Sequence, residues 1–258
     1  MRILVEPSDY ILRNAGDMAM MQVAVERLSA AWPQAKIRIL SDVPERMPAY
    51  AANAQPLDSA GRQIWYRPGF LAGRLEAHLP PRLCERIRRF EWILRQRQPQ
   101  IVAAILRRKL RWAGCATDAL DEFLAAVTSA DLVIANGMGG ITDAFTDYAT
   151  ELLSTLALAQ WHGVATAMVG QGMGPLDDPA LRALAQQVLP KVDFISLREQ
   201  RAGGPLLRSL GVRPERLLTT GDDAIELAYT QRAAALGDGL GINLRLSAYA
   251  AVDEQLVA

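Results

Sequence analysis

The chain has 258 residues, half of them hydrophobic and 22% charged, so it can bury one large core or two modest ones. Lysine plus arginine equals aspartate plus glutamate at 28 each, which excludes a global charge that attracts nucleic acid or membrane. Cys84 and Cys115 are too few for a disulfide framework or metal site, and no apolar stretch reaches the roughly 18 residues of a membrane span. We expect a metal-free globular protein in a reducing compartment, the cytoplasm.

Strand and helix patterns alternate along most of the chain. Residues 2–5 and 36–40 are β-rich runs, and between them residues 17–32 carry apolar side chains at helical spacing. The same alternation returns later as strands at 132–136, 164–169, 192–197 and 216–219, with helices near 144–161, 178–188 and 199–210. This repetition predicts an α/β fold with a parallel sheet covered by helices on both faces.

A middle segment, about 60–128, interrupts this alternation and predicts a helical insert. From Arg82 to Arg111 the cations far outnumber the acids Glu85 and Glu91, and an apolar stripe runs through the same residues. One interpretation is a solvated face whose long arginines cover apolar surface. The other is contact with an anionic or membrane-held substrate. No interleaved aromatic residues point to nucleic acid.

The last twenty residues have a different character. A glycine-rich junction at 237–241 precedes a short strand-like run at 242–245 that ends at Arg245. We expect a first domain over 1–238, and over 239–258 the start of a second domain that continues beyond residue 258. The alternative, that these residues pack back as an extra strand and helix, stays open.

The turn between the first strand and the first helix is a candidate anion site. Asn14 and Asp17 can cap the helix, and Gly16 allows a close approach to its N-terminus. A plain helix cap would account for Asp17 alone. A nicotinamide cofactor is a poor fit, because the G-x-G-x-x-G fingerprint does not follow the first strand.

Two glycine-rich loops and one arginine follow later strands. Gly137, Gly139 and Gly140 leave the backbone free to take positive φ, and the next loop places Gly170, Gly172 and Gly174 around Gln171. Arg198 falls at the end of the strand 192–197 and offers a planar fork for a carboxylate or phosphate, unless it pairs with Glu199 or Asp222. Because parallel strands end at one sheet edge, we expect these segments to share a pocket.

Together these segments resemble the polysaccharide pyruvyltransferase family. The resemblance rests on Asn14-x-Gly-Asp17, on the runs ending at Gly140 and Pro175, on Ser196-Leu-Arg198 and on Thr219-Thr-Gly-Asp222, and it covers about 1–245 without the basic insert. It implies a Rossmann-like first half of a GT-B-like two-domain fold. It also implies transfer of pyruvyl from phosphoenolpyruvate to a sugar diol as a ketal, on a polysaccharide or lipid-linked precursor, without metal or redox cofactor. The substrate-binding residues expected on this basis are Asn14, Gly16, Asp17, Gly139, Gly140, Gln171, Gly172, Arg198, Asp222 and Arg245.

The general acid is the part of this mechanism that the sequence does not supply. Ketal formation requires protonation of the enol carbon, and the resemblance places the catalytic histidine in the second half, beyond residue 258. His78 lies in the insert and His162 at a helix end, where a structural role is expected. We therefore expect little turnover from residues 1–258 alone. Two alternatives stay open: a GT-B nucleotide-sugar glycosyltransferase, and a non-catalytic module whose basic helices, with Arg88, Arg89 and Arg108, dock a partner.

Overall fold

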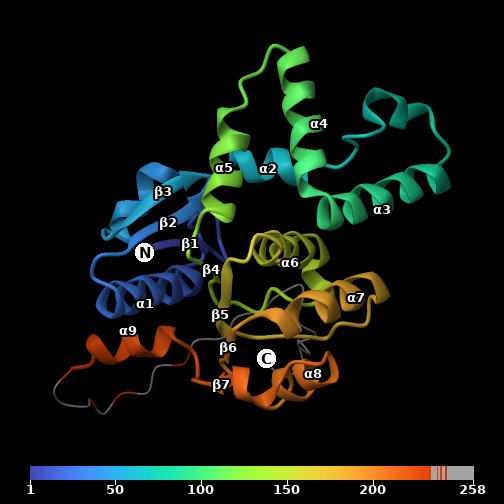
Figure 1. The fold of residues 1–258 in the computed structure, drawn as a ribbon. Helices are drawn as coiled ribbons and strands as arrows, with labels where there is room; N and C mark the ends of the chain where they lie inside the picture. The colour runs from blue at the N-terminus through green and yellow to red at the C-terminus, as the bar shows by residue number, and fades with distance from the viewer. Residues whose placement is uncertain (234–236, 238, 240–241, 243–258) are drawn as a thin grey trace.

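In a computed structural model of the chain, parallel strands form one open sheet in the order β3-β2-β1-β4-β5-β6-β7 (Figure 1). The structure describes residues 1–233 together with 237, 239 and 242. The strands are β1 (Arg2–Glu6), β2 (Lys36–Ser41), β3 (Ala54–Asp58), β4 (Leu132–Ala135), β5 (Ala165–Gln171), β6 (Phe194–Leu197) and β7 (Leu217–Thr219). The predicted parallel α/β sheet with a Rossmann-like order is confirmed.

Helices cover both faces of this sheet. They are α1 (Ala15–Ala31), α2 (Ala60–Tyr66), α3 (Pro81–Arg97), α4 (Pro99–Trp112), α5 (Asp118–Thr128), α6 (Thr146–Trp161), α7 (Pro179–Val188), α8 (Gly203–Ser209) and α9 (Ala224–Thr230). Because strand side chains alternate between faces, Ile3 and Val5 pack with α1, whereas Leu4 packs with the core that contains α2, α5, α6, α7 and α8. Helix α9 lies beside α1.

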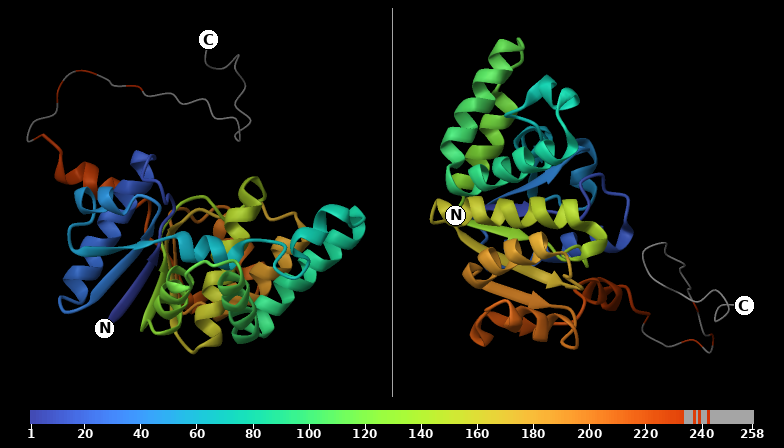
Figure 2. Two further views of the ribbon diagram at one scale, coloured as in Figure 1. Left: turned by 90° about the horizontal axis from the view of Figure 1, so that it is seen from above. Right: turned by 90° about the vertical axis from the view of Figure 1, so that its right-hand side faces the viewer.

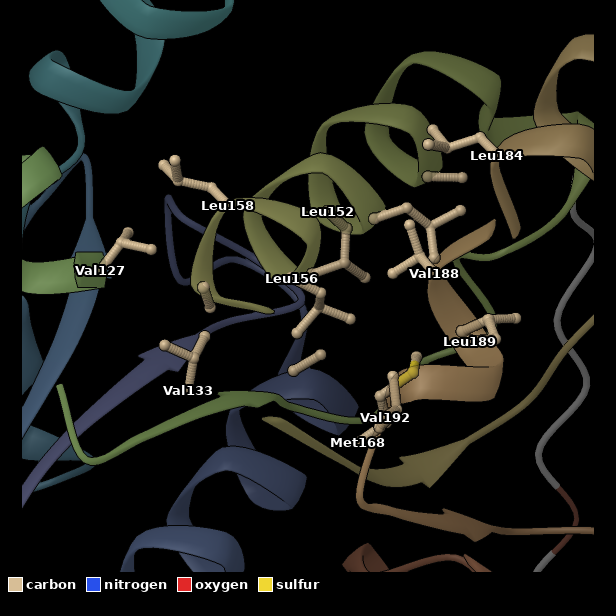
Figure 3. Close-up of a cluster of buried hydrophobic side chains, with 14 of the residues drawn as sticks. Val127, Val133, Leu152, Leu156, Leu158, Met168, Leu184, Val188, Leu189 and Val192 are labelled. Carbon is tan, nitrogen blue, oxygen red and sulfur yellow. The ribbon is translucent and has the colours of Figure 1, made fainter. Parts of the chain in front are cut away.

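The larger core lies between the sheet and α6. Leu152 and Leu156 of this helix point toward Val133 and Met168 of the central strands, and all four side chains are buried (Figure 3). Residues of α7 close the same cluster from the side. This packing holds the carboxyl ends of β4, β5 and β6 at fixed positions, because interiors of this kind are close-packed.

The predicted insert is helical, and its two ends belong to the body of the fold. Trp65 of α2 and Phe123 of α5 are fully buried in the core beneath the sheet. Helices α3 and α4 extend away from the sheet (Figures 1 and 2). No helix among the described residues combines the length and apolar character needed to cross a bilayer.

Two elements were not predicted. Strand β3 contains Pro56 and buries only Leu57, so it lacks the apolar alternation that identifies a strand, and its edge position tolerates the proline. Helix α9 buries none of its residues. The predicted start of a second domain at 239–258, with its strand-like run to Arg245, lies almost entirely outside the described residues.

Candidate functional site

The candidate site lies between β1 and β4, where the order of the strands in the sheet changes direction. From β1 the chain continues to β2 on one side, and from β4 it continues to β5 on the other side. Strands β1 and β4 are neighbours, with Glu6 opposite Ala135 at their carboxyl ends. The chain leaves β1 toward α1 on one face and leaves β4 toward α6 on the other. A crevice outside the strand ends at such a switch point is where open α/β sheets bind ligands.

Arg198 lies against both glycine loops at this edge. Its backbone N–H donates to the Gln171 carbonyl at 3.0 Å, which fixes its position after β6. A Cβ atom at Gly172 would stand 2.8 Å from the guanidinium Nε, and one at Gly139 would stand 3.1 Å from Nη2. Glycine at both positions therefore lets the guanidinium lie directly on the two loops.

The guanidinium of Arg198 keeps donors available. Within the described part of the chain its ion-pair partner is Asp222, whose Oδ2 is 3.8 Å from Nη1, too far for a hydrogen bond. Both side chains are about one-third exposed, at 36% and 37%. The predicted pairing with Asp222 is thus loose. Glu199 instead accepts from the N–H groups of Ala202 and Gly203.

The reason for glycine in these loops differs from the one predicted. Positive φ occurs at Gly170 (60°) and Gly174 (88°), but not at Gly137, Gly139 or Gly140. A side chain has no room at Gly137 and Gly140, and at Gly139 it would press on the Arg198 guanidinium. A Cβ at Gly137 would approach the Gly170 carbonyl oxygen to 2.5 Å, so this glycine lets β4 and β5 run close together as they end.

The Gln171 side chain supports the glycine loops and is not exposed to a ligand. Its side chain is buried, and its Nε2 donates to the carbonyls of Ala135 and Asn136 at 3.1 Å. Because these bonds use the amide protons, Gln171 holds the two glycine loops together and does not present its N–H groups to a ligand. The ring of Tyr148 packs against Gly140, where it would lie 2.6 Å from an added Cβ.

The turn before α1 is organised by a residue that the sequence analysis missed. The Asp9 carboxylate accepts from the backbone N–H groups of Ile11, Arg13 and Asn14. Burial raises its pKa, but these N–H donors more than offset that effect and hold the pKa below its usual value. The Asn14 side chain then accepts from Gly16 N at 3.1 Å, the predicted helix cap. An Asp several residues before an N-cap is the only signal that could have identified Asp9.

Asp17 is a carboxyl group of the site with a raised pKa. It lies in the first turn of α1, and its pKa is raised to about 6 by burial and by the nearby charge of Asp9. Ser8, Asn14 and Arg198 lower the pKa and limit the rise. Asp17 and Arg198, which are distant in the sequence, are thus close enough to interact electrostatically.

Comparison with family models decides the classification. Residues 14–256 match the model of the polysaccharide pyruvyl transferase family, a match that begins at Asn14. The chain belongs to this family. No curated protein matches the sequence. The resemblance inferred from the motifs is confirmed at the level of the family.

In this pyruvyl transferase family member, the structure brings nine of the ten predicted site residues to one edge of the sheet, and Arg245 lies outside the described residues. The histidines are elsewhere. His162 follows α6 at the opposite edge, and His78 is exposed in the insert. A cavity of about 550 Å³ lies between α2 and α4, but its lining, which includes Phe70 and Leu106, shares no residue with the glycine loops.

Proposed function

We propose that residues 1–238 form the donor-binding half of a GT-B-like pyruvyltransferase that uses phosphoenolpyruvate. In the proposed reaction, one sugar hydroxyl adds to C2 of the enol while C3 gains a proton and becomes a methyl group. A second hydroxyl of the same sugar then bonds to C2, and phosphate leaves with the C2–O electron pair. The products are a cyclic ketal and inorganic phosphate.

The position of Arg198 carries this proposal. Its guanidinium rests on Gly139 and Gly172 at the edge where the N-terminus of α1 also lies, and no carboxylate in the described part of the chain comes closer to it than Asp222, at 3.8 Å. A planar guanidinium fork matches a carboxylate or a phosphate, and phosphoenolpyruvate carries both. The positive end of the α1 dipole favours the same anion.

We assign the other site residues by what they touch. Asp17 and Asp222 are the carboxylates beside Arg198 and are proposed to orient the sugar hydroxyls or to contact the donor. Gly139, Gly140 and Gly172 provide bare backbone, and Gln171 positions the loops. The general acid stays unassigned among the described residues. The acceptor is proposed to be a glycan or a lipid-linked sugar, and the basic helices within 82–111 offer a surface toward a membrane.

Binding of phosphoenolpyruvate tests the proposal directly. We expect phosphoenolpyruvate to raise the Tm, and Arg198→Ala to weaken its binding about tenfold to a hundredfold, because a charged hydrogen-bonding partner is lost. Arg198→Lys should keep only part of the affinity for phosphoenolpyruvate, since an ammonium group lacks the planar fork of a guanidinium. The matched control is Arg213→Ala, an exposed arginine at the opposite edge of the sheet.

The outcomes separate the alternatives. Stabilisation by nucleotide-sugars but not by phosphoenolpyruvate would favour a glycosyltransferase. No stabilisation by either, with Arg198→Ala indistinguishable from wild type, would contradict the proposal and favour a binding module. Release of phosphate from phosphoenolpyruvate in the presence of a sugar acceptor measures the transfer itself.

A further inference from the structure

Helix α3 departs from the usual pattern of an amphipathic surface helix. Three of its apolar side chains face solvent, with Leu83, Phe90 and Ile93 42%, 54% and 40% exposed, while Trp92 and Leu94 are half-buried and pack against the core. Two of its charged side chains, Glu91 and Arg95, are instead buried against the body of the protein. An exposed apolar face of this kind on a soluble domain marks an interaction surface.

Specific hydrogen bonds hold the charged side of α3 inward. Glu91 accepts from Gly69 N at 2.8 Å and Leu71 N at 2.6 Å, in the segment that follows α2. Arg95 donates to the carbonyls of Trp65 at 2.8 Å and Arg67 at 2.7 Å, which end α2. Rotating α3 to bury its apolar side would leave these four backbone groups and two charges unpaired, at a high cost. The apolar side is therefore held outward.

The outward side is strongly cationic as well as apolar. On a helical projection, one arc of roughly 160° contains nine residues, of which Leu94 is half-buried and packs against the core. We call the other eight the outer face of α3; they are Arg82, Leu83, Arg86, Ile87, Arg89, Phe90, Ile93 and Arg97. Seven of these side chains are exposed and Ile87 is half-buried. Glu85, the exposed acid of α3, lies outside the arc.

We propose that the outer face of α3 docks on the surface of an anionic lipid bilayer. Apolar side chains interleaved with arginines match the boundary between acyl chains and phosphate headgroups, where the rings and aliphatic tips enter and the guanidinium groups bind phosphate. Helix α3 projects from the body of the fold (Figure 2), and seven of the eight side chains on its outer face are exposed, so the face is accessible to a lipid surface. The surplus of cations gives the complementarity to negative lipids.

Vesicle binding by the full chain tests this inference. We expect co-sedimentation with vesicles of phosphatidylcholine and phosphatidylglycerol in equal parts, and much weaker binding to phosphatidylcholine alone. Phe90→Ser should lower the partition coefficient about tenfold, and Arg86→Gln about fivefold. Tyr229→Ser and Arg213→Gln remove an exposed ring and an exposed arginine elsewhere and should bind like wild type.

The variants are informative because the substituted side chains are exposed. An unchanged Tm for Phe90→Ser would show that any loss of binding is local. No binding of the wild type to the anionic vesicles would overturn the inference, and so would equal binding to neutral ones. Concentration-dependent self-association that Phe90→Ser abolishes would also overturn it, since a second copy would then cover the face. The inference does not depend on the proposed transferase activity, because no donor or acceptor enters the assay.

Discussion

Replacing Asp17 by asparagine should stabilise the protein at neutral pH. The folded state raises the pKa of this carboxyl group from 3.8 to about 6, so ionised Asp17 is less favourable in the folded chain than in the unfolded one. That difference corresponds to about 3 kcal/mol at most, and solvent screening of a half-buried group, with the favourable dipole of α1, reduces it to about 1–2 kcal/mol. Asparagine occupies the same volume without the charge.

The upward direction of the Asp17 pKa shift determines how the effect of the substitution on stability depends on pH. Because the folded pKa is raised, the cost of Asp17 is absent below 3.8, grows as the pH rises from there to about 6, and is constant above that value. Asp17→Asn should therefore raise the free energy of unfolding fully at about pH 7.5, and by only about a third as much at about pH 4.5. Urea denaturation at both pH values measures it, and at neutral pH the Tm should rise by a few degrees.

A matched control distinguishes the local effect of the Asp17 charge from the effect of changing the net charge of the protein. Asp177→Asn removes the same charge at an exposed position and should leave stability nearly unchanged at both pH values. If Asp17→Asn is neutral or destabilising at about pH 7.5, or if its effect does not shrink at about pH 4.5, the electrostatic account of the site is wrong.

Three further substitutions probe the loops. Gly172→Ala places a methyl group 2.8 Å from Arg198 Nε, so binding of phosphoenolpyruvate, measured by calorimetry, should weaken about tenfold while the Tm changes little, since the guanidinium can move. Gly137→Ala collides with the Gly170 backbone and should cost about 1–3 kcal/mol in urea denaturation. Asp9→Ala leaves backbone N–H groups unpaired and should cost about 1–3 kcal/mol at neutral pH. Because the pKa of Asp9 is lowered, that cost should shrink in urea titrations as the pH falls below 3.8.

Much of the fold could be predicted because its signals are local. Buried strands such as β4 are short apolar runs, and Gly163 and Gly211 end α6 and α8 with φ values of 72° and 90°, as the sequence indicates for helix C-caps. Strand β3 could not be predicted from periodicity. It is an edge strand with one buried side chain, and its pairing with β2 comes from the backbone.

The sequence proposes residues for the candidate site, but it does not predict how they are arranged. Local sequence shows that Gly139 and Gly172 lack side chains, but only the packed loops show that Arg198 occupies the space a Cβ would fill. The role of Gln171 is likewise decided by the carbonyls that surround it. The orientation of α3 depends on backbone groups of the preceding segment that need partners, which no property of its own sequence reveals.

The arrangement also explains why a site can be assembled from segments so distant in sequence. In a parallel sheet every strand ends at the same edge, so the turn at Asn14, the two glycine loops and Arg198 meet there without any long-range motif. Each segment then supplies one property: a helix N-terminus, bare backbone, or a guanidinium. Arg198 lies in close contact with the glycine backbone, and its ion pair with Asp222 is long at 3.8 Å, so its guanidinium is positioned in advance for the anion binding proposed above.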